Sequence, residues 1–138
     1  MITAEEETRF AELQEQALDA ARLGDTQLLN TMLDAGMPVN LADAKENTLL
    51  MLAAYHGREE ATRLLLQKGA NHSQRNGMNQ TPLAGAAFKG YLDIVKLLIN
   101  AGADPHEEME PGKTALIFAE MFGQMEVANY LRSLPKPA

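Results

Sequence analysis

Two kinds of apolar segment alternate along the chain, and both have the spacing of a buried helix. Residues 49–55 read Leu-Leu-Met-Leu-Ala-Ala-Tyr and lie between Thr48 and Gly57. A threonine can cap the first turn of a helix, and a glycine suits its left-handed end. Residues 94–99 read Ile-Val-Lys-Leu-Leu-Ile, and Gly102 ends that run. The pattern predicts a short first helix followed by a second helix antiparallel to it.

These helix signals recur with a period of 33 residues. Three ladders keep the spacing without an insertion: Gly24, Gly57, Gly90 and Gly123; Gly36, Gly69 and Gly102; and Thr48, Thr81 and Thr114. Residues 103–113, with Asp104-Pro105 and Pro111-Gly112, have the composition of turns that join one helix pair to the next. Because one helix pair cannot bury both of its sides, the repeat predicts an all-α array of stacked pairs.

The third period carries the fullest version of this pattern. Residues 79–104 read Asn-Gln-Thr-Pro-Leu-Ala-Gly-Ala-Ala-Phe-Lys-Gly-Tyr-Leu-Asp-Ile-Val-Lys-Leu-Leu-Ile-Asn-Ala-Gly-Ala-Asp. This segment resembles the ankyrin repeat, whose period is 33 and whose signature begins Thr-Pro-Leu. The resemblance covers about residues 10–134 and implies a solenoid of antiparallel helix pairs joined by β-hairpin-like loops. It implies one domain over residues 1–138, with repeats at about 10–42, 43–75, 76–108 and 109–134.

The two ends depart from the repeat in ways that indicate caps. Residues 4–23 predict an acidic first helix with no Thr-Pro pair, and Thr3 and Glu6 have the spacing of a capping box. At the other end, Pro135-Lys136-Pro137 stops the last helix. Polar or aromatic residues also interrupt the leucine-rich face of that helix: Tyr130, Arg132 and Ser133. We therefore expect the terminal repeats to close the array.

Composition narrows the classes of partner. The chain has 46% hydrophobic and 22% charged residues, which is typical of a globular protein, and its lack of cysteine excludes disulfide scaffolds and thiolate chemistry. The net charge of −7 opposes binding to nucleic acid or an anionic membrane. The acidic start, Met-Ile-Thr-Ala-Glu-Glu-Glu, is unlike a secretory signal, and the longest apolar run is too short for a bilayer. We expect a cytoplasmic protein without a membrane segment.

Residue types that serve catalysis or metal binding are present but are not arranged for either. The three histidines, His56, His72 and His106, lack the spacing of a zinc site, although His106 with Glu107 and Glu108 leaves a metal-dependent regulator or enzyme as an alternative. Gly112 is followed by Lys113 and Thr114, but a phosphate-binding loop also needs a glycine five residues before Gly112, where this chain has Glu107. We expect a non-enzymatic protein without a cofactor or metal.

The resemblance also implies a binding face. In ankyrin repeats, partners usually lie across the concave side, on the hairpin tips and on the last residues of each first helix. Carried over to this chain, those last residues form a stripe of four pairs: Arg22 and Leu23, Tyr55 and His56, Phe88 and Lys89, and Met121 and Phe122. Met78, at a hairpin tip, is a further candidate. Aromatic residues and methionine are enriched in protein interfaces.

The stripe has two interpretations. Its aromatic residues could belong to the core, but the inward positions of the same helices already carry Leu50, Leu52, Ala53, Leu83, Ala86, Leu116, Phe118 and Ala119. We therefore expect Phe88 and Phe122 to be exposed and the chain to bind an unidentified protein or peptide as a monomer. The alternatives are a homo-oligomer joined through Met121 and Phe122, and binding at charged hairpin tips around Lys45, Arg75 and Glu108.

Overall fold

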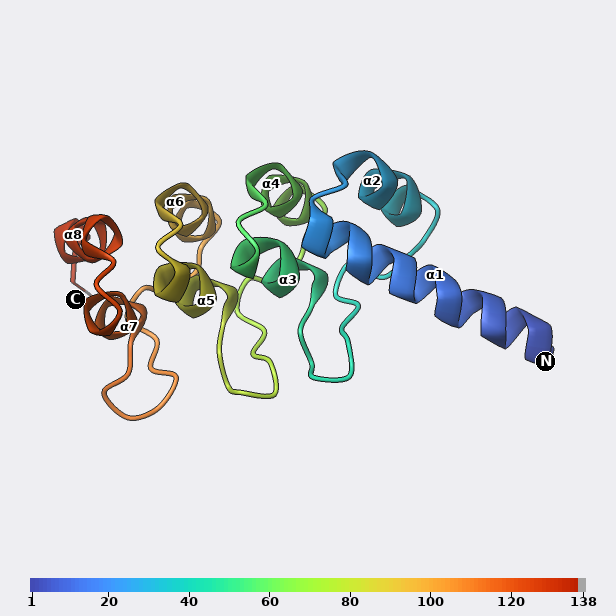
Figure 1. Ribbon diagram of the computed structural model, residues 1–138. Coiled ribbons are helices and arrows are strands. Elements are labelled where there is room, and N and C mark those ends of the chain that lie inside the picture. The colour runs from blue at the N-terminus through green and yellow to red at the C-terminus, as the bar shows by residue number, and fades with distance from the viewer. Residues whose placement is uncertain (137–138) are drawn as a thin grey trace.

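The computed structural model describes residues 1–136, and within them the chain forms eight helices in four antiparallel pairs (Figure 1). The pairs are α1 (Ala4–Leu23) and α2 (Thr26–Asp34), α3 (Leu49–Tyr55) and α4 (Glu59–Gln67), α5 (Pro82–Lys89) and α6 (Leu92–Asn100), and α7 (Ala115–Met121) and α8 (Met125–Ser133). The expected all-α solenoid of stacked helix pairs is confirmed.

The helix boundaries follow from the residues that the ladders contain. The hydroxyl oxygens of Thr48, Thr81 and Thr114 accept hydrogen bonds from the backbone N–H groups three residues later, at 3.1, 3.2 and 3.3 Å. These contacts satisfy donors that a helix start would otherwise leave without a partner. The predicted starts of α3, α5 and α7 are therefore confirmed.

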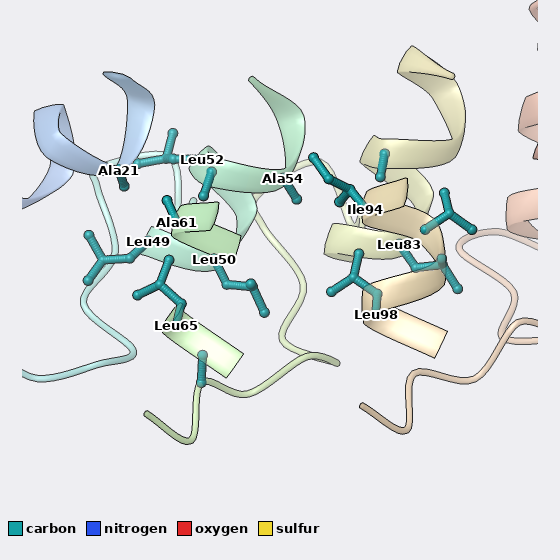
Figure 2. Close-up of a cluster of buried hydrophobic side chains, with 14 of the residues drawn as sticks. Ala21, Leu49, Leu50, Leu52, Ala54, Ala61, Leu65, Leu83, Ile94 and Leu98 are labelled. Atoms are coloured by element: carbon teal, nitrogen blue, oxygen red, sulfur yellow. The ribbon is translucent and has the colours of Figure 1, made fainter. Parts of the chain in front are cut away.

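The helices pack in two rows. In an inner row, α1, α3, α5 and α7 contact one another in that order, and in an outer row α2, α4, α6 and α8 do the same (Figure 1). The core lies between the rows, where Leu49, Leu50 and Leu65 are almost fully buried (Figure 2). Small residues let the inner helices approach closely, and the buried alanines of α3 and α5 are Ala53, Ala54, Ala84, Ala86 and Ala87.

Three long hairpins connect the pairs and extend from the inner row, on the side away from α2, α4, α6 and α8 (Figure 1). We name them the first (residues 35–48), second (68–81) and third (101–114) hairpins. The first and third each contain one antiparallel bridge, Ala42 with Thr48 and Glu110 with Lys113. No longer strand forms within residues 1–136, so the connections resemble β-hairpins without a sheet.

The helix pairs at the two ends differ from the inner ones. The N-terminal turns of α1 extend beyond the array, and residues 4–12 are exposed throughout (Figure 1). At the other end, Leu116 and Phe118 are only half-buried, although we expected both to fill inward positions. Leu116 still packs against the core, as expected, but both side chains stay partly accessible because no described helix pair packs against the far side of α7. Pro137, one of the two prolines predicted to stop the last helix, lies outside the described residues.

Within residues 1–136, no helix combines the length and the apolar character that crossing a bilayer requires.

Candidate functional site

The predicted stripe lies along one edge of the inner row. Because α1, α3, α5 and α7 contact one another in order, their last residues lie side by side. Most stripe residues are exposed; Phe122, for example, keeps 50% of its surface accessible. Arg22 and Phe88 are half-buried. Met78 lies on the second hairpin and is 78% exposed.

Three aromatic rings of the stripe form a continuous row. The rings of Tyr55 and Phe88 are stacked, with centroids 6.3 Å apart and planes at 8°, and Phe88 meets Phe122 edge to face at 4.4 Å. Both arrangements are favourable for aromatic pairs. The expectation that Phe122 is exposed is confirmed, but the one for Phe88 was wrong, because the rings on both sides cover it.

A hollow of about 390 Å³ opens beside this aromatic row. It lies between the first and second hairpins and the C-terminal ends of α3 and α5, and its lining residues are Lys45, Asn47, Met51, Leu52, Tyr55, His56, Asn76, Met78, Gln80 and Phe88. Four of the nine predicted binding residues thus meet in one place: Tyr55, His56, Met78 and Phe88. Arg22 lines a different hollow, between α1 and the first hairpin, and Leu23, Lys89, Met121 and Phe122 lie outside both.

Hydrogen bonds hold the hairpins in a fixed row. The N–H of Gly77 donates to the carbonyl oxygen of Lys45 at 2.9 Å, and the Asn76 amide donates to Oδ1 of Asn47 at 2.9 Å. A Cβ atom at residue 77 would lie only 3.0 Å from that carbonyl oxygen, so glycine permits the close approach. These bonds join the two walls of the hollow.

The second and third hairpins are joined by Arg75. Its guanidinium donates to the Glu107 carboxylate at 2.7 Å and to the carbonyl oxygens of Glu108 and Met109. The hairpin-tip alternative includes Arg75 as a charge that a partner could reach. The structure instead uses it within the protein, as a link between hairpins.

Three lysines lie close to the stripe or the hollow. Lys89 Nζ lies 5.2 Å from the centroid of the Tyr55 ring, Lys113 Nζ lies 3.9 Å from Met121 Sδ, and Lys45 lines the hollow. None of these three lysines has an ion-pair partner in the part of the chain that the structure describes.

The surroundings of His56 lower the pKa of its imidazole. Partial burial lowers the pKa of its imidazole below the ordinary value, and the nearby charges of Arg58, Arg22 and Lys89 lower it further. The ring also meets Tyr55 edge to face, with centroids 5.6 Å apart. His56 is therefore neutral at pH 7 and adds an aromatic surface rather than a charge.

Part of the hollow is marked by a periodic signal in the sequence. Asn47, Gln80 and Lys113 are separated by 33 residues, and each directly precedes a helix-capping threonine. Asn47 and Gln80 line the hollow, and Lys113 contacts Met121 of the stripe. A polar residue at one position in every repeat could have identified this wall, whereas nothing periodic marks Met51 and Leu52 as lining residues.

The placement of the acidic and histidine side chains bears on the metal-site alternative. Within residues 1–136, no group of three or more His, Asp or Glu side chains is placed to hold a metal ion. Two of the three residues of the metal-site alternative have other contacts. Glu107 pairs with Arg75, and His106 Nε2 lies 3.3 Å from the carbonyl oxygen of Pro135. The stripe and hollow offer apolar area, amide groups and positive charge.

Comparisons with known proteins agree with this architecture. Residues 18–109 match the family model of ankyrin repeats, in three copies. A 49-residue segment, 36% of this chain, is 50% identical to an ankyrin repeat protein of Pseudomonas aeruginosa and spans 29% of it. A segment of 84 residues, 59% of this chain, is 38% identical to the mouse oxysterol-binding protein-related protein 1 and 37% identical to the human one. It spans 9% of each of those proteins, so this chain matches only a small part of these relatives.

Proposed function

Since this chain belongs to the ankyrin repeat family, whose repeats are generally protein–protein interaction modules, we propose that it is a non-enzymatic module that binds a partner protein or peptide. The binding surface is the concave face, by which we mean the stripe and the adjoining sides of the three hairpins. The partner contacts the aromatic row and the hollow beside it.

The observation that carries this proposal is the row of Tyr55, Phe88 and Phe122. Single exposed apolar residues are common on proteins, but a contiguous apolar patch with a polar rim is typical of an interaction site. This row spans three helices, and its rim includes Lys89, His56 and the amides of Asn47 and Gln80. Aromatic residues in such positions commonly supply most of the binding free energy.

The mechanism is rigid presentation. The hydrogen bonds of Asn76, Gly77 and Arg75 hold neighbouring hairpins together, and the inner helices are fixed by their buried alanines. A surface that is ordered before binding loses little conformational entropy when the partner arrives. The aromatic row then contributes affinity, and the surrounding charges contribute selectivity.

Quantitative affinity capture with three single variants tests the proposal. Tyr55→Ala and Phe122→Ala each remove one exposed ring of the row, whereas Met125→Ala removes an exposed apolar side chain, 53% accessible, from the outer helix α8. Wild type and each variant are used as bait in a native lysate, and the bound proteins are compared by mass spectrometry. Urea unfolding of each bait shows that it is folded.

The expected result is a set of proteins that wild type and Met125→Ala retain and that Tyr55→Ala or Phe122→Ala loses, because a few aromatic anchors dominate such interfaces. Retention of the same proteins by all four baits would place the binding surface elsewhere. Equal loss from the Met125→Ala bait would show that the effect is not specific to the concave face.

A further inference from the structure

Three lysines accompany the aromatic row of a chain that is acidic as a whole. Acidic residues outnumber basic ones by 19 to 12, yet Lys45, Lys89 and Lys113 all lie against the stripe or the hollow without an ion-pair partner among the described residues. They come from the first hairpin, the end of α5 and the third hairpin, so the positive charge is spread along the same direction as the aromatic row.

Among the described residues, no carboxylate forms an ion pair with these lysines, including Glu46 beside Lys45 and Glu110, whose backbone forms a bridge with Lys113. Asp19 and Asp43 both pair with Arg22, at 2.6 and 3.7 Å, and Asp43 also accepts hydrogen bonds from two backbone N–H groups of the first hairpin. Glu120 pairs with Arg132 at 2.6 Å. Burial contributes most to the lowered pKa of His56, and the charges of Arg58, Arg22 and Lys89 lower it further, which agrees with positive charge at the end of α3.

The hollow supplies groups that suit a peptide. Its floor includes Met51, Leu52 and the rings of Tyr55 and Phe88, and its lining contains no carboxylate. On its wall, the side-chain amide of Gln80 makes no hydrogen bond within residues 1–136, so its donors and acceptor are available to the backbone of a bound chain.

We infer that the concave face binds an acidic, extended segment of a partner protein, which places an apolar side chain in the hollow and carboxylates against Lys45, Lys89 and Lys113. This inference rests on the proposed function and specifies the chemistry of the partner. The apolar contact supplies affinity, and the three lysines steer the segment and set its direction along the row. Nucleic acid is disfavoured because the chain as a whole is acidic and would repel a continuous phosphate backbone.

Peptide selection followed by direct binding measurements tests the inference. A phage-displayed library of random dodecapeptides is selected on the wild-type chain, and enriched peptides are synthesised with a fluorescent label. Their affinity is measured by fluorescence polarisation against wild type, a Lys89→Glu/Lys113→Glu double variant, Tyr55→Ala and Phe122→Ala. Lys96→Glu is the control for a charge reversal, since Lys96 is also an exposed lysine without an ion-pair partner among the described residues but lies on α6.

We expect the enriched peptides to carry acidic residues on both sides of an apolar one. The double variant should bind them at least about tenfold more weakly, and Lys96→Glu should change the affinity by less than about twofold. Affinity should also fall as salt concentration rises, because the lysines are exposed and their charges are screened.

Failure of the inference is distinguishable from failure of the proposed function. Peptides that need Tyr55 but carry no excess of acids, or that bind the double variant normally, would overturn the inference and leave the concave face as the binding site. Peptides that bind Tyr55→Ala and Phe122→Ala as well as wild type would contradict the proposed function.

Three further outcomes would also overturn the inference. The first is that the selection enriches no peptide that needs Tyr55. In the second, a single-stranded dodecanucleotide binds more tightly than the peptides do. In the third, the mass of the free chain increases with concentration in wild type but not in the Lys89→Glu/Lys113→Glu variant. That result would identify a second copy, bound through its acidic α1, as the occupant of the concave face.

Discussion

At the scale of single residues, equivalent positions of the repeat have unequal surroundings. Gly90 and Gly123 both adopt a left-handed conformation, with φ of 81° and 71°. A Cβ atom on Gly90 would collide with the side chain of Gln124, which donates from Nε2 to the carbonyl oxygen of Phe88 at 2.9 Å. A Cβ atom on Gly123 would meet nothing within 4 Å.

These surroundings predict different costs for the same substitution. Gly123→Ala should lower the free energy of unfolding by about 1 kcal/mol, because a side chain disfavours the left-handed conformation. Gly90→Ala should cost about 1 kcal/mol more, since it also displaces the Gln124 hydrogen bond. Thermal denaturation of both variants checks the order. Equal melting temperatures would mean that Gln124 contributes nothing to stability.

The two phenylalanines of the stripe should respond differently to truncation. Phe88 is half-buried between two rings, so Phe88→Ala should lower the free energy of unfolding by about 2 kcal/mol, roughly half the cost at a fully buried site. Phe122 is 50% exposed, and Phe122→Ala should cost less than about 1 kcal/mol. Urea denaturation midpoints measure both values. A larger loss for Phe122→Ala would place that ring in the core.

His56 predicts a dependence of stability on pH. Its pKa in the folded chain is lowered, so the unfolded chain binds a proton more readily, and stability falls as the pH drops from about 6.5 through the lowered pKa. Urea unfolding at pH 7.5 and 5.5 should show a lower midpoint at pH 5.5, and His56→Gln should reduce this difference. If His56→Gln leaves the difference unchanged, other groups cause the pH dependence.

At the scale of helices, the residue that follows a helix-ending glycine links neighbouring repeats. Arg58 donates from Nε to the carbonyl oxygen of Arg22 at 2.8 Å, as Gln124 does to that of Phe88, so side chains of one pair satisfy the end of the preceding inner helix. The tip residues Glu46 and Asn79 have positive φ, 65° and 64°, at the position that Gly112 occupies in the third hairpin.

The unequal burial of the helices predicts an order of hydrogen exchange. Residues 82–87 of α5 are buried, and α5 packs between α3 and α7, whereas residues 4–12 of α1 are exposed. Local opening requires less free energy where few tertiary contacts are lost. Exchange followed by NMR should therefore be slowest in α5 and α6 and fastest at residues 8–12. Protection of residues 8–12 equal to that of α5 would contradict this order.

At the scale of the whole molecule, the net charge of −7 opposes association, while the exposed Met121, Phe122 and Met125 at the last helix pair favour it. Charge repulsion acts over the whole surface, whereas a stable interface usually takes about 20–30 residues from each partner, many more than these three side chains. The homo-oligomer therefore remains the alternative to a monomeric binding module.

Light scattering across a dilution series distinguishes these two states. We expect a mass near 15.1 kDa at all concentrations in low salt, because the like charges keep the chains apart. Phe122→Ala serves as the comparison. A mass that doubles with concentration in wild type but not in Phe122→Ala would establish a dimer formed through the stripe.

The sequence by itself determined the repeat, the helices and the row of stripe residues. The ladders of glycine and threonine encode local backbone requirements, a left-handed helix end and a capped first turn, which depend on the residue at that position and hold in any surroundings. A strict period of 33 then brings equivalent residues together, so Tyr55, Phe88 and Phe122 could be placed along one edge before their coordinates were known.

Only the tertiary structure decided how exposed the side chains are and which partners they contact. Phe88 is half-buried because of the rings on both sides, Leu116 and Phe118 are partly accessible because no described pair covers α7, and Arg75 is engaged because Glu107 lies across the gap between hairpins. Each outcome depends on a neighbour about 30 residues away or on the lack of one. A pattern along the chain specifies which face a side chain occupies, whereas burial and ion pairing depend on the packing of that face.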